Sequence, residues 1–139
     1  MRRIFALTML LAALVAPGVA QGEPAPWQAV VSGQIAAFRA QDGAAALGFA
    51  GQGFRMQFAG EPEMFDEAIA AAGYGAIGES RTHSFGAFNR ISETAVLQVV
   101  TFVGADQLLY EAVYQLADEP DEGWRVQGVV MRRAAGLGI

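Results

Sequence analysis

The 139-residue sequence contains no cysteine and no lysine, and its single histidine is His83. Without cysteine, neither a disulfide framework nor a thiolate metal site is available, so the folded chain must be stabilised by packing. One histidine among scattered carboxylates does not supply the three or four ligands of a zinc site. The sequence contains nine arginines and 14 acidic residues, which gives a formal net charge of −5. This acidic balance argues against nucleic acid or an anionic membrane surface as a partner.

The N-terminal residues have the pattern of a secretory signal peptide. Arg2 and Arg3 precede an apolar run at 4–16, which is too short to span a bilayer, and small residues follow at 18–20. We predict a signal peptide over residues 1–20, cleaved near Ala20, and a periplasmic or secreted location in a bacterium. An uncleaved membrane anchor is the alternative. After cleavage no membrane association is expected, because no later apolar run is long enough to span a bilayer.

The first half of residues 21–139 has the spacing of helices. Apolar residues recur three and four positions apart and predict one amphipathic helix: Trp27, Val30, Val31, Ile35 and Phe38. Asp42 is a typical N-cap for a second helix over Gly43–Phe49. The segment GQGFRMQF that follows is predicted to be irregular. A third helix is predicted over Glu61–Ala72, with Gly73 as its C-terminal stop.

The second half has the spacing of strands. The apolar period changes from about 3.6 to 2, which predicts strands at Thr82–Ile91, Thr94–Val103, Leu108–Ala117 and Trp124–Arg132. Short turns between them make neighbouring strands antiparallel. The expected fold is α+β, with N-terminal helices packed on a curved four-stranded antiparallel meander sheet, in a single domain over residues 21–139.

Assumed pairings of Val103 with Leu108 and of Gln115 with Arg125 assign side chains to the two sheet faces. The face expected under the helices is nearly all apolar: Leu97, Val99, Thr101, Val103, Leu108, Tyr110, Ala112, Tyr114, Leu116, Trp124, Val126 and Val130. The other face mixes apolar and polar residues: Val96, Gln98, Val100, Phe102, Leu109, Glu111, Val113, Gln115, Arg125, Gln127, Val129 and Met131. Since protein interfaces have this mixture of apolar and polar residues, we predict a homodimer that forms through the outer face. The alternative is that the C-terminal tail or the N-terminal helix of the same chain covers this face.

The stretch GYGAIG, Gly73–Gly78, matches the G-x-G-x-x-G pattern of dinucleotide-binding turns. That motif requires a strand before it and a helix after it. Here a predicted helix precedes the glycines and a predicted strand follows them. We therefore interpret the stretch as a helix stop and a flexible crossing into the sheet, and expect no cofactor.

Other polar segments carry no specific catalytic signal. DEPDEG, at 118–123, lacks the spacing of a calcium loop and is interpreted as a solvated hairpin tip, with weak divalent binding as the alternative. No G-x-S-x-G nucleophile elbow is present. We accordingly predict no metal site and no catalytic residue.

The candidate ligand site lies at the open end of the helix-covered face. Tyr110 and Tyr114 are expected to line a cavity there, with Tyr74, Arg81 and His83 at its mouth. Such a cavity suits a small apolar molecule or an organic acid. The favoured function is a non-enzymatic ligand-binding or accessory module. The alternative is a small acid–base enzyme, of isomerase or hydrolase type, with His83 or a pocket tyrosine as proton carrier.

Five segments in order carry a family resemblance: QIAAFRAQDGAAALGFA (34–50), MFDEAIAAAGY (64–74), SFG (84–86), YEAVYQL (110–116) and GWRVQGV (123–129). They resemble a bacterial exported family, domain of unknown function 4864, in the nuclear transport factor 2-like (cystatin-like cone) superfamily. The resemblance implies the fold and the exported location, and it implies no catalytic residues. Some cone-fold relatives are isomerases or hydrolases that use an Asp, His or Tyr inside the pocket. No acidic residue lies on the predicted inner face, which departs from the isomerase pattern.

Overall fold

The structure, a computed structural model, describes residues 24–133. The predicted signal peptide, residues 1–20, lies outside this described part. Among residues 24–133, no helix combines the length and the apolar character needed to cross a bilayer.

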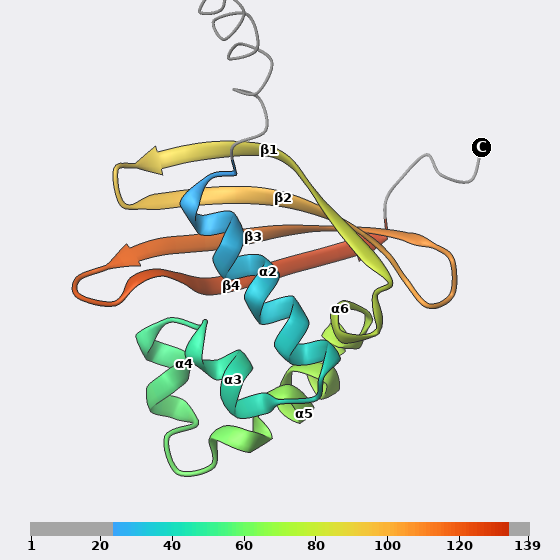
Figure 1. The fold of residues 1–139 in the computed structure, drawn as a ribbon, viewed down its shortest axis with the longest axis horizontal. Helices are drawn as coiled ribbons and strands as arrows, with labels where there is room; N and C mark the ends of the chain where they lie inside the picture. Colours follow the sequence, from blue (N-terminus) through green and yellow to red (C-terminus); the bar gives the residue numbers. More distant parts are fainter. Residues whose placement is uncertain (1–23, 134–139) are drawn as a thin grey trace, which may run out of the picture.

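The long N-terminal helix, α2 (Pro26–Arg39), crosses one face of the sheet diagonally (Figure 1). Its predicted apolar stripe is confirmed, since Trp27, Val31 and Ile35 are all buried. Pro26 stands in the first turn, where a missing N–H leaves no hydrogen bond unmade. Burial of this stripe therefore packs α2 against the sheet.

The next two helices are short, and the sequence pattern predicts only the first of them. α3 (Gly43–Gly48) begins as predicted at Asp42, whose carboxylate accepts from the backbone N–H of Ala45 at 3.0 Å. The prediction of an irregular GQGFRMQF segment is wrong, because α4 (Gln52–Gln57) forms there. Just before α4, the chain pairs with the sheet edge, where Gly51 N donates to the carbonyl of Val126 at 2.8 Å. This pairing holds the small helices against the last strand.

The predicted third helix is divided into short turns. They are η3 (Pro62–Met64), α5 (Phe65–Ile69) and the π-helical turn η4 (Ala70–Tyr74). A further helix, α6 (Gly75–Glu79), follows beyond the predicted range. Gly73 has φ 106° and breaks the helix, as a C-terminal glycine does. The predicted crossing after it is wrong, because α6 begins inside the GYGAIG stretch. Since α6 follows helical turns and not a strand, the dinucleotide-binding arrangement is still absent from this stretch.

Four strands then form the predicted meander. They are β1 (Thr82–Ser92), β2 (Ala95–Val103), β3 (Leu109–Glu119) and β4 (Gly123–Arg133), in the order β1-β2-β3-β4 with every neighbouring pair antiparallel. The described helices lie on one side of this sheet (Figure 1). The predicted α+β class is confirmed, and the arrangement is consistent with a nuclear transport factor 2-like cone.

The predicted faces of β2 are exchanged in the structure. Val103 pairs with Leu109 and not with Leu108, because the turn closes on the Gly104–Leu108 pair with Gln107 at φ 70°. A register shift of one residue moves every side chain of a strand to the opposite face. The β2 residues under the helices are therefore Val96, Gln98, Val100 and Phe102, and Leu97, Val99, Thr101 and Val103 lie on the outer face.

A bulge changes the faces of β4 along its length. Leu116 pairs with Val126 but Gln115 pairs with Gly128, so Gln127 is an extra residue in β4. Trp124 and Val126 lie on the helix side as predicted, and the bulge brings Val129 and Met131 to the same side, against prediction. Val130, predicted to be inside, is 70% exposed. The assumed pairing of Gln115 with Arg125 is likewise wrong, because Arg125 pairs with Ala117.

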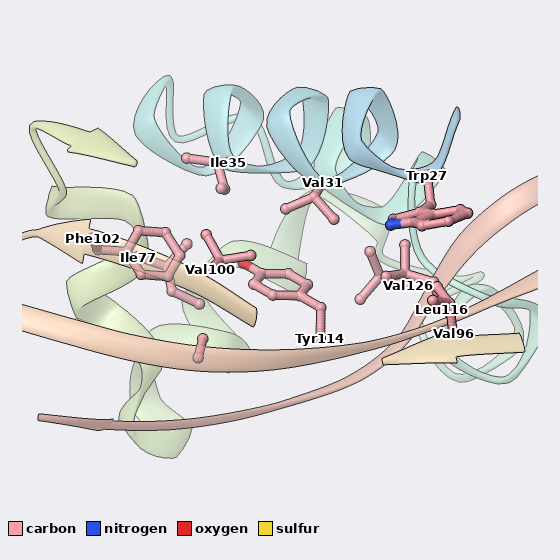
Figure 2. Close-up of a cluster of buried hydrophobic side chains, with 11 residues drawn as sticks. Trp27, Val31, Ile35, Ile77, Val96, Val100, Phe102, Tyr114, Leu116 and Val126 are labelled. Carbon is pink, nitrogen blue, oxygen red and sulfur yellow. The ribbon is translucent and has the colours of Figure 1, made fainter. Parts of the chain in front are cut away.

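The main core lies between α2 and the inner face of the sheet (Figure 2). Val31 and Ile35 point down from the helix toward Val100, Phe102 and Tyr114, and Tyr114 is on the inner face as predicted. A second buried cluster, built around Phe65, joins α3 and α5 to the end of α2. The fold therefore contains two adjacent apolar cores under one helix.

Gln98 is a fully buried amide within the main core. Its Oε1 accepts from the indole Nε1 of Trp27 at 2.8 Å, and its Nε2 donates to the carbonyls of Val99 at 2.8 Å and Gly86 at 3.0 Å. Gly86 lies where the β1–β2 register shifts, between Phe85 and Phe88. Gln98 thus joins the start of α2 to the bulge of β1.

Candidate functional site

An apolar cavity of about 290 Å³ lies between α2, the turns from α5 to α6, and β4. It is lined by Gln34, Phe38, Ala50, Phe54, Phe65, Ile69, Ala72, Tyr74, Ile77, Val126, Gly128 and Val129. Gln34 and Tyr74 are the only members of this set with a polar side chain, and none is charged. The cavity therefore favours an uncharged, apolar guest.

Three aromatic rings form one wall of the cavity. The ring of Phe65 lies 5.8 Å from that of Phe38 and 5.8 Å from that of Phe54, between centroids. Phe65 is almost fully buried, which fixes the orientation of the wall. Because Phe54 comes from α4, a helix that the sequence pattern does not indicate, the pattern does not indicate this wall either.

The β4 bulge contributes a second part of the cavity lining. Val126 and Val129 are three residues apart, so in a regular strand they would point to opposite faces. The extra residue at Gln127 brings both to the helix side, and both line the cavity. The bulge is thus the local feature that shapes this site.

Gln34 supplies the buried amide of the cavity lining. It is only 3% exposed, and its Nε2 donates to the carbonyl of Ala46 at 3.1 Å, which joins α2 to α3. This bond uses one of the two Nε2 hydrogens, so the polar groups of the lining are the Oε1 and second N–H of Gln34 and the hydroxyl of Tyr74.

A smaller cleft, of about 150 Å³, adjoins the cavity and shares Phe38, Ile69 and Tyr74 with it. Its lining also contains Arg39, Asp66 and Glu79, so charges of both signs are present. The two spaces together therefore have an apolar part and a charged part, which share these three residues in their linings.

The five predicted site residues are not brought together. Tyr74 lines the cavity and the adjoining cleft. Tyr110 lines a separate hollow of about 280 Å³, where its hydroxyl donates to Asp106 at 2.5 Å. Arg81 is exposed on the chain leading into β1, and its backbone N–H donates to Val103.

Tyr114 lies in the core and does not line the cavity. It pairs across the sheet with Val129 and belongs to the same buried cluster as Ile77 and Val126. Those three neighbours line the cavity, and Tyr114 does not. Its hydroxyl is buried and has no hydrogen-bond partner within residues 24–133. Burial raises the pKa of this phenol well above its ordinary value, so the hydroxyl stays protonated.

His83 forms a hydroxyl–imidazole pair with α2. Its Nε2 lies 2.9 Å from the Oγ of Ser32, and its ring is nearly perpendicular to that of Phe85, with the ring centroids 5.6 Å apart. Burial, and then the positive charge of Arg39, lower the pKa of His83 below the ordinary 6.5. No carboxylate bonds to the imidazole in the described part of the chain, and none of the three spaces above is lined by His83.

The lowered pKa of His83 predicts a pH dependence. Above pH 6.5 the imidazole is neutral in both the folded and the unfolded chain. As the pH falls through that value, the unfolded chain takes up the proton first, so the folded state loses stability until the lower folded pKa is passed. Urea unfolding of the wild type and of His83→Gln should show the wild-type advantage shrinking on acidification. An advantage that grows on acidification would contradict this assignment.

The acidic β3–β4 hairpin tip, residues 118–123, is bonded to the start of α4 and to β4. Glu119 accepts from the backbone N–H of Gln52 at 3.0 Å and from Gln127 at 2.9 Å, and it pairs with Arg55 at 3.4 Å. Burial acts to raise the pKa of Glu119, but these hydrogen bonds and the Arg55 charge outweigh it, so the pKa is lowered. The prediction of a merely solvated tip is therefore incomplete. In the described residues, no group of three or more acidic or histidine side chains is placed to hold a metal ion.

Fold and site together define an α+β domain whose helices cover one face of an antiparallel meander and enclose an apolar cavity beside its last strand. The chain belongs to the family described as Domain of unknown function (DUF4864), whose model matches residues 21–139. Searches of curated proteins and of solved structures give no match to the chain. The family predicted from the sequence segments is thereby confirmed.

Proposed function

We propose that this protein is a non-enzymatic binding module that holds a small, uncharged apolar molecule in the cavity between α2, α5, α6 and β4. The observation that carries the proposal is the lining itself, which has about 290 Å³ of space and no charged side chain. Burial of an apolar guest against such walls is favourable by about 0.8 kcal/mol per CH₂ group.

The lining favours a neutral guest over an organic acid. A carboxylate placed there would lose its hydration without gaining a cation, which is strongly unfavourable. The nearest cation offered by the adjoining cleft is Arg39, and that cleft also contains Asp66 and Glu79. A ligand with one hydrogen-bond donor fits better, because Gln34 Oε1 and the Tyr74 hydroxyl can accept from it.

The acid–base enzyme alternative receives less support from the geometry. Catalysis by His83 would require the imidazole to face a space that admits a substrate. Instead His83 pairs with Ser32 and lines neither the cavity nor the cleft. Of the candidate pocket tyrosines, Tyr114 lies in the core with a raised pKa and Tyr110 lines a separate hollow. Tyr74 does line the cavity, but no charged side chain that could exchange a proton with it lines the same space.

We further propose that the domain acts in the bacterial periplasm or outside the cell and belongs to the nuclear transport factor 2-like superfamily. The signal-peptide pattern of residues 1–20 supports the location. The helices on one face of a four-stranded meander support the superfamily.

A blocked cavity tests the binding proposal. Ala72 is exposed at the cavity, so Ala72→Trp places an indole at its entrance without disturbing the core. Titration with N-phenyl-1-naphthylamine, a neutral apolar fluorophore, should show saturable binding by the wild type and at least a tenfold weaker affinity for Ala72→Trp.

The matched control is Ala71→Trp. Ala71 is the neighbouring exposed residue of η4 and lines neither the cavity nor the adjoining cleft. This variant should bind the fluorophore as the wild type does. If the wild type shows no saturable binding, or if both tryptophan variants bind equally well, the cavity is not the binding site.

A further inference from the structure

The face of the sheet turned away from the helices carries an apolar row. Val99 of β2 pairs with Val113 of β3, and Val113 pairs with Val130 of β4. None of these valines belongs to either buried cluster, and Val130 is 70% exposed. A side chain added at Gly86 of β1 would meet Val99, so the row begins at the first strand with a residue that adds no bulk. We call Gly86, Val99, Val113 and Val130 the valine row.

Apart from Leu97, the positions on either side of the valine row are polar or small. One flanking row is Thr101, Glu111 and Arg132, and the other is Leu97, Gln115 and Gly128. Glu111 is the single acidic residue of these three rows, and Arg132 neutralises it at 2.6 Å. This part of an acidic chain therefore has no net charge.

We propose that this outer face is the interface of a homodimer, in which two sheets stack face to face on their valine rows. Four strands about 4.8 Å apart and nine residues of about 3.3 Å each give a face of roughly 600 Å² in projection. That is near the roughly 800 Å² per partner of a standard stable interface. The inference does not depend on the proposed ligand.

A second copy fits this face because the rows complement themselves. A two-fold axis along the valine row places valine on valine and sets the flanking row that contains Glu111 over the one that contains Gln115. No Glu111 then faces another Glu111, so like charges are kept apart. The net negative charge of the chain lies outside the contact, so its repulsion acts through solvent and is screened by salt.

Light scattering on the full protein at high micromolar concentration tests the dimer. The wild type should have the mass of two chains, and Val130→Arg the mass of one. The control is Met56→Arg, because Met56 is 69% exposed on α4, away from the sheet, and this variant should remain a dimer. Circular dichroism should show all three proteins folded, as expected for changes at exposed side chains.

Two results would overturn the proposal. One is a wild type that remains a monomer at this concentration, which would mean that the chain itself covers the face or that nothing does. The other is a Val130→Arg variant that dimerises as the wild type does, which would place the interface elsewhere.

Discussion

Gln98→Leu is expected to lower the free energy of unfolding by about 3 kcal/mol. Leucine has nearly the volume of glutamine, so the change removes hydrogen bonds and leaves little cavity. The buried indole N–H of Trp27 would then lose its acceptor, and the carbonyl of Gly86 would lose its side-chain donor. Each unsatisfied buried group opposes folding by about 1–3 kcal/mol, and the apolar gain of leucine offsets only part of this.

The control for this variant is Gln115→Leu. Gln115 is exposed on the outer face of β3, so its replacement should change the stability by only about 0.5 kcal/mol. Urea unfolding of both variants at low micromolar concentration gives the comparison. Similar small losses for the two would show that Gln98 does not stabilise the fold through this network.

A double-mutant cycle measures how much the hydrogen bond between Trp27 and Gln98 contributes to stability. Trp27→Phe removes the indole donor to Gln98 while keeping an aromatic ring in the core. Because both single changes break the same hydrogen bond, the double variant should lose less stability than the sum of the two singles. Strict additivity would mean that the two side chains act independently.

Tyr114→Phe is expected to raise the free energy of unfolding by about 1–2 kcal/mol. The hydroxyl is buried and lacks a partner among the described residues, so folding removes it from water without compensation. Phenylalanine keeps the ring packing and eliminates that unfavourable burial. Thermal unfolding of the wild type and the variant measures the difference.

Tyr110→Phe is the matched control, with the opposite sign. The hydroxyl of Tyr110 donates to Asp106, so its removal should lower the stability by about 1 kcal/mol or less. If Tyr114→Phe were also destabilising, the buried hydroxyl would have to be hydrogen-bonded in solution. The core beneath the cavity would then contain a polar contact that the structure does not show.

The helices and strands were predictable where a local period determines them. The spacing of Trp27, Val31 and Ile35 specifies one buried helix face, and alternation after residue 80 specifies strands. The face of each strand depends on single residues in turns. One residue in the 104–108 turn exchanged the faces of β2, and one at Gln127 changed those of β4.

The site was less predictable than the fold. Its lining comes from α2, α4, α5, α6 and β4, and neither α4 nor α6 has a strong signal in sequence. Polar chemistry directed attention to Tyr74, Arg81, His83, Tyr110 and Tyr114, of which only Tyr74 lines the cavity. The actual lining is mainly apolar side chains, which a sequence does not distinguish from ordinary core. Phe38 and Phe54, for example, are as consistent with packing as with a ligand wall.

The most direct test of the ligand cavity is a methyl NMR titration of the protein with N-phenyl-1-naphthylamine. The account predicts chemical-shift changes at the methyl groups of Ile69, Ile77, Val126 and Val129, which line the cavity. The methyl groups of Val99, Val113 and Val130, on the other side of the sheet, should not respond. No change at the four lining residues, or changes centred on the three outer valines, would contradict the account.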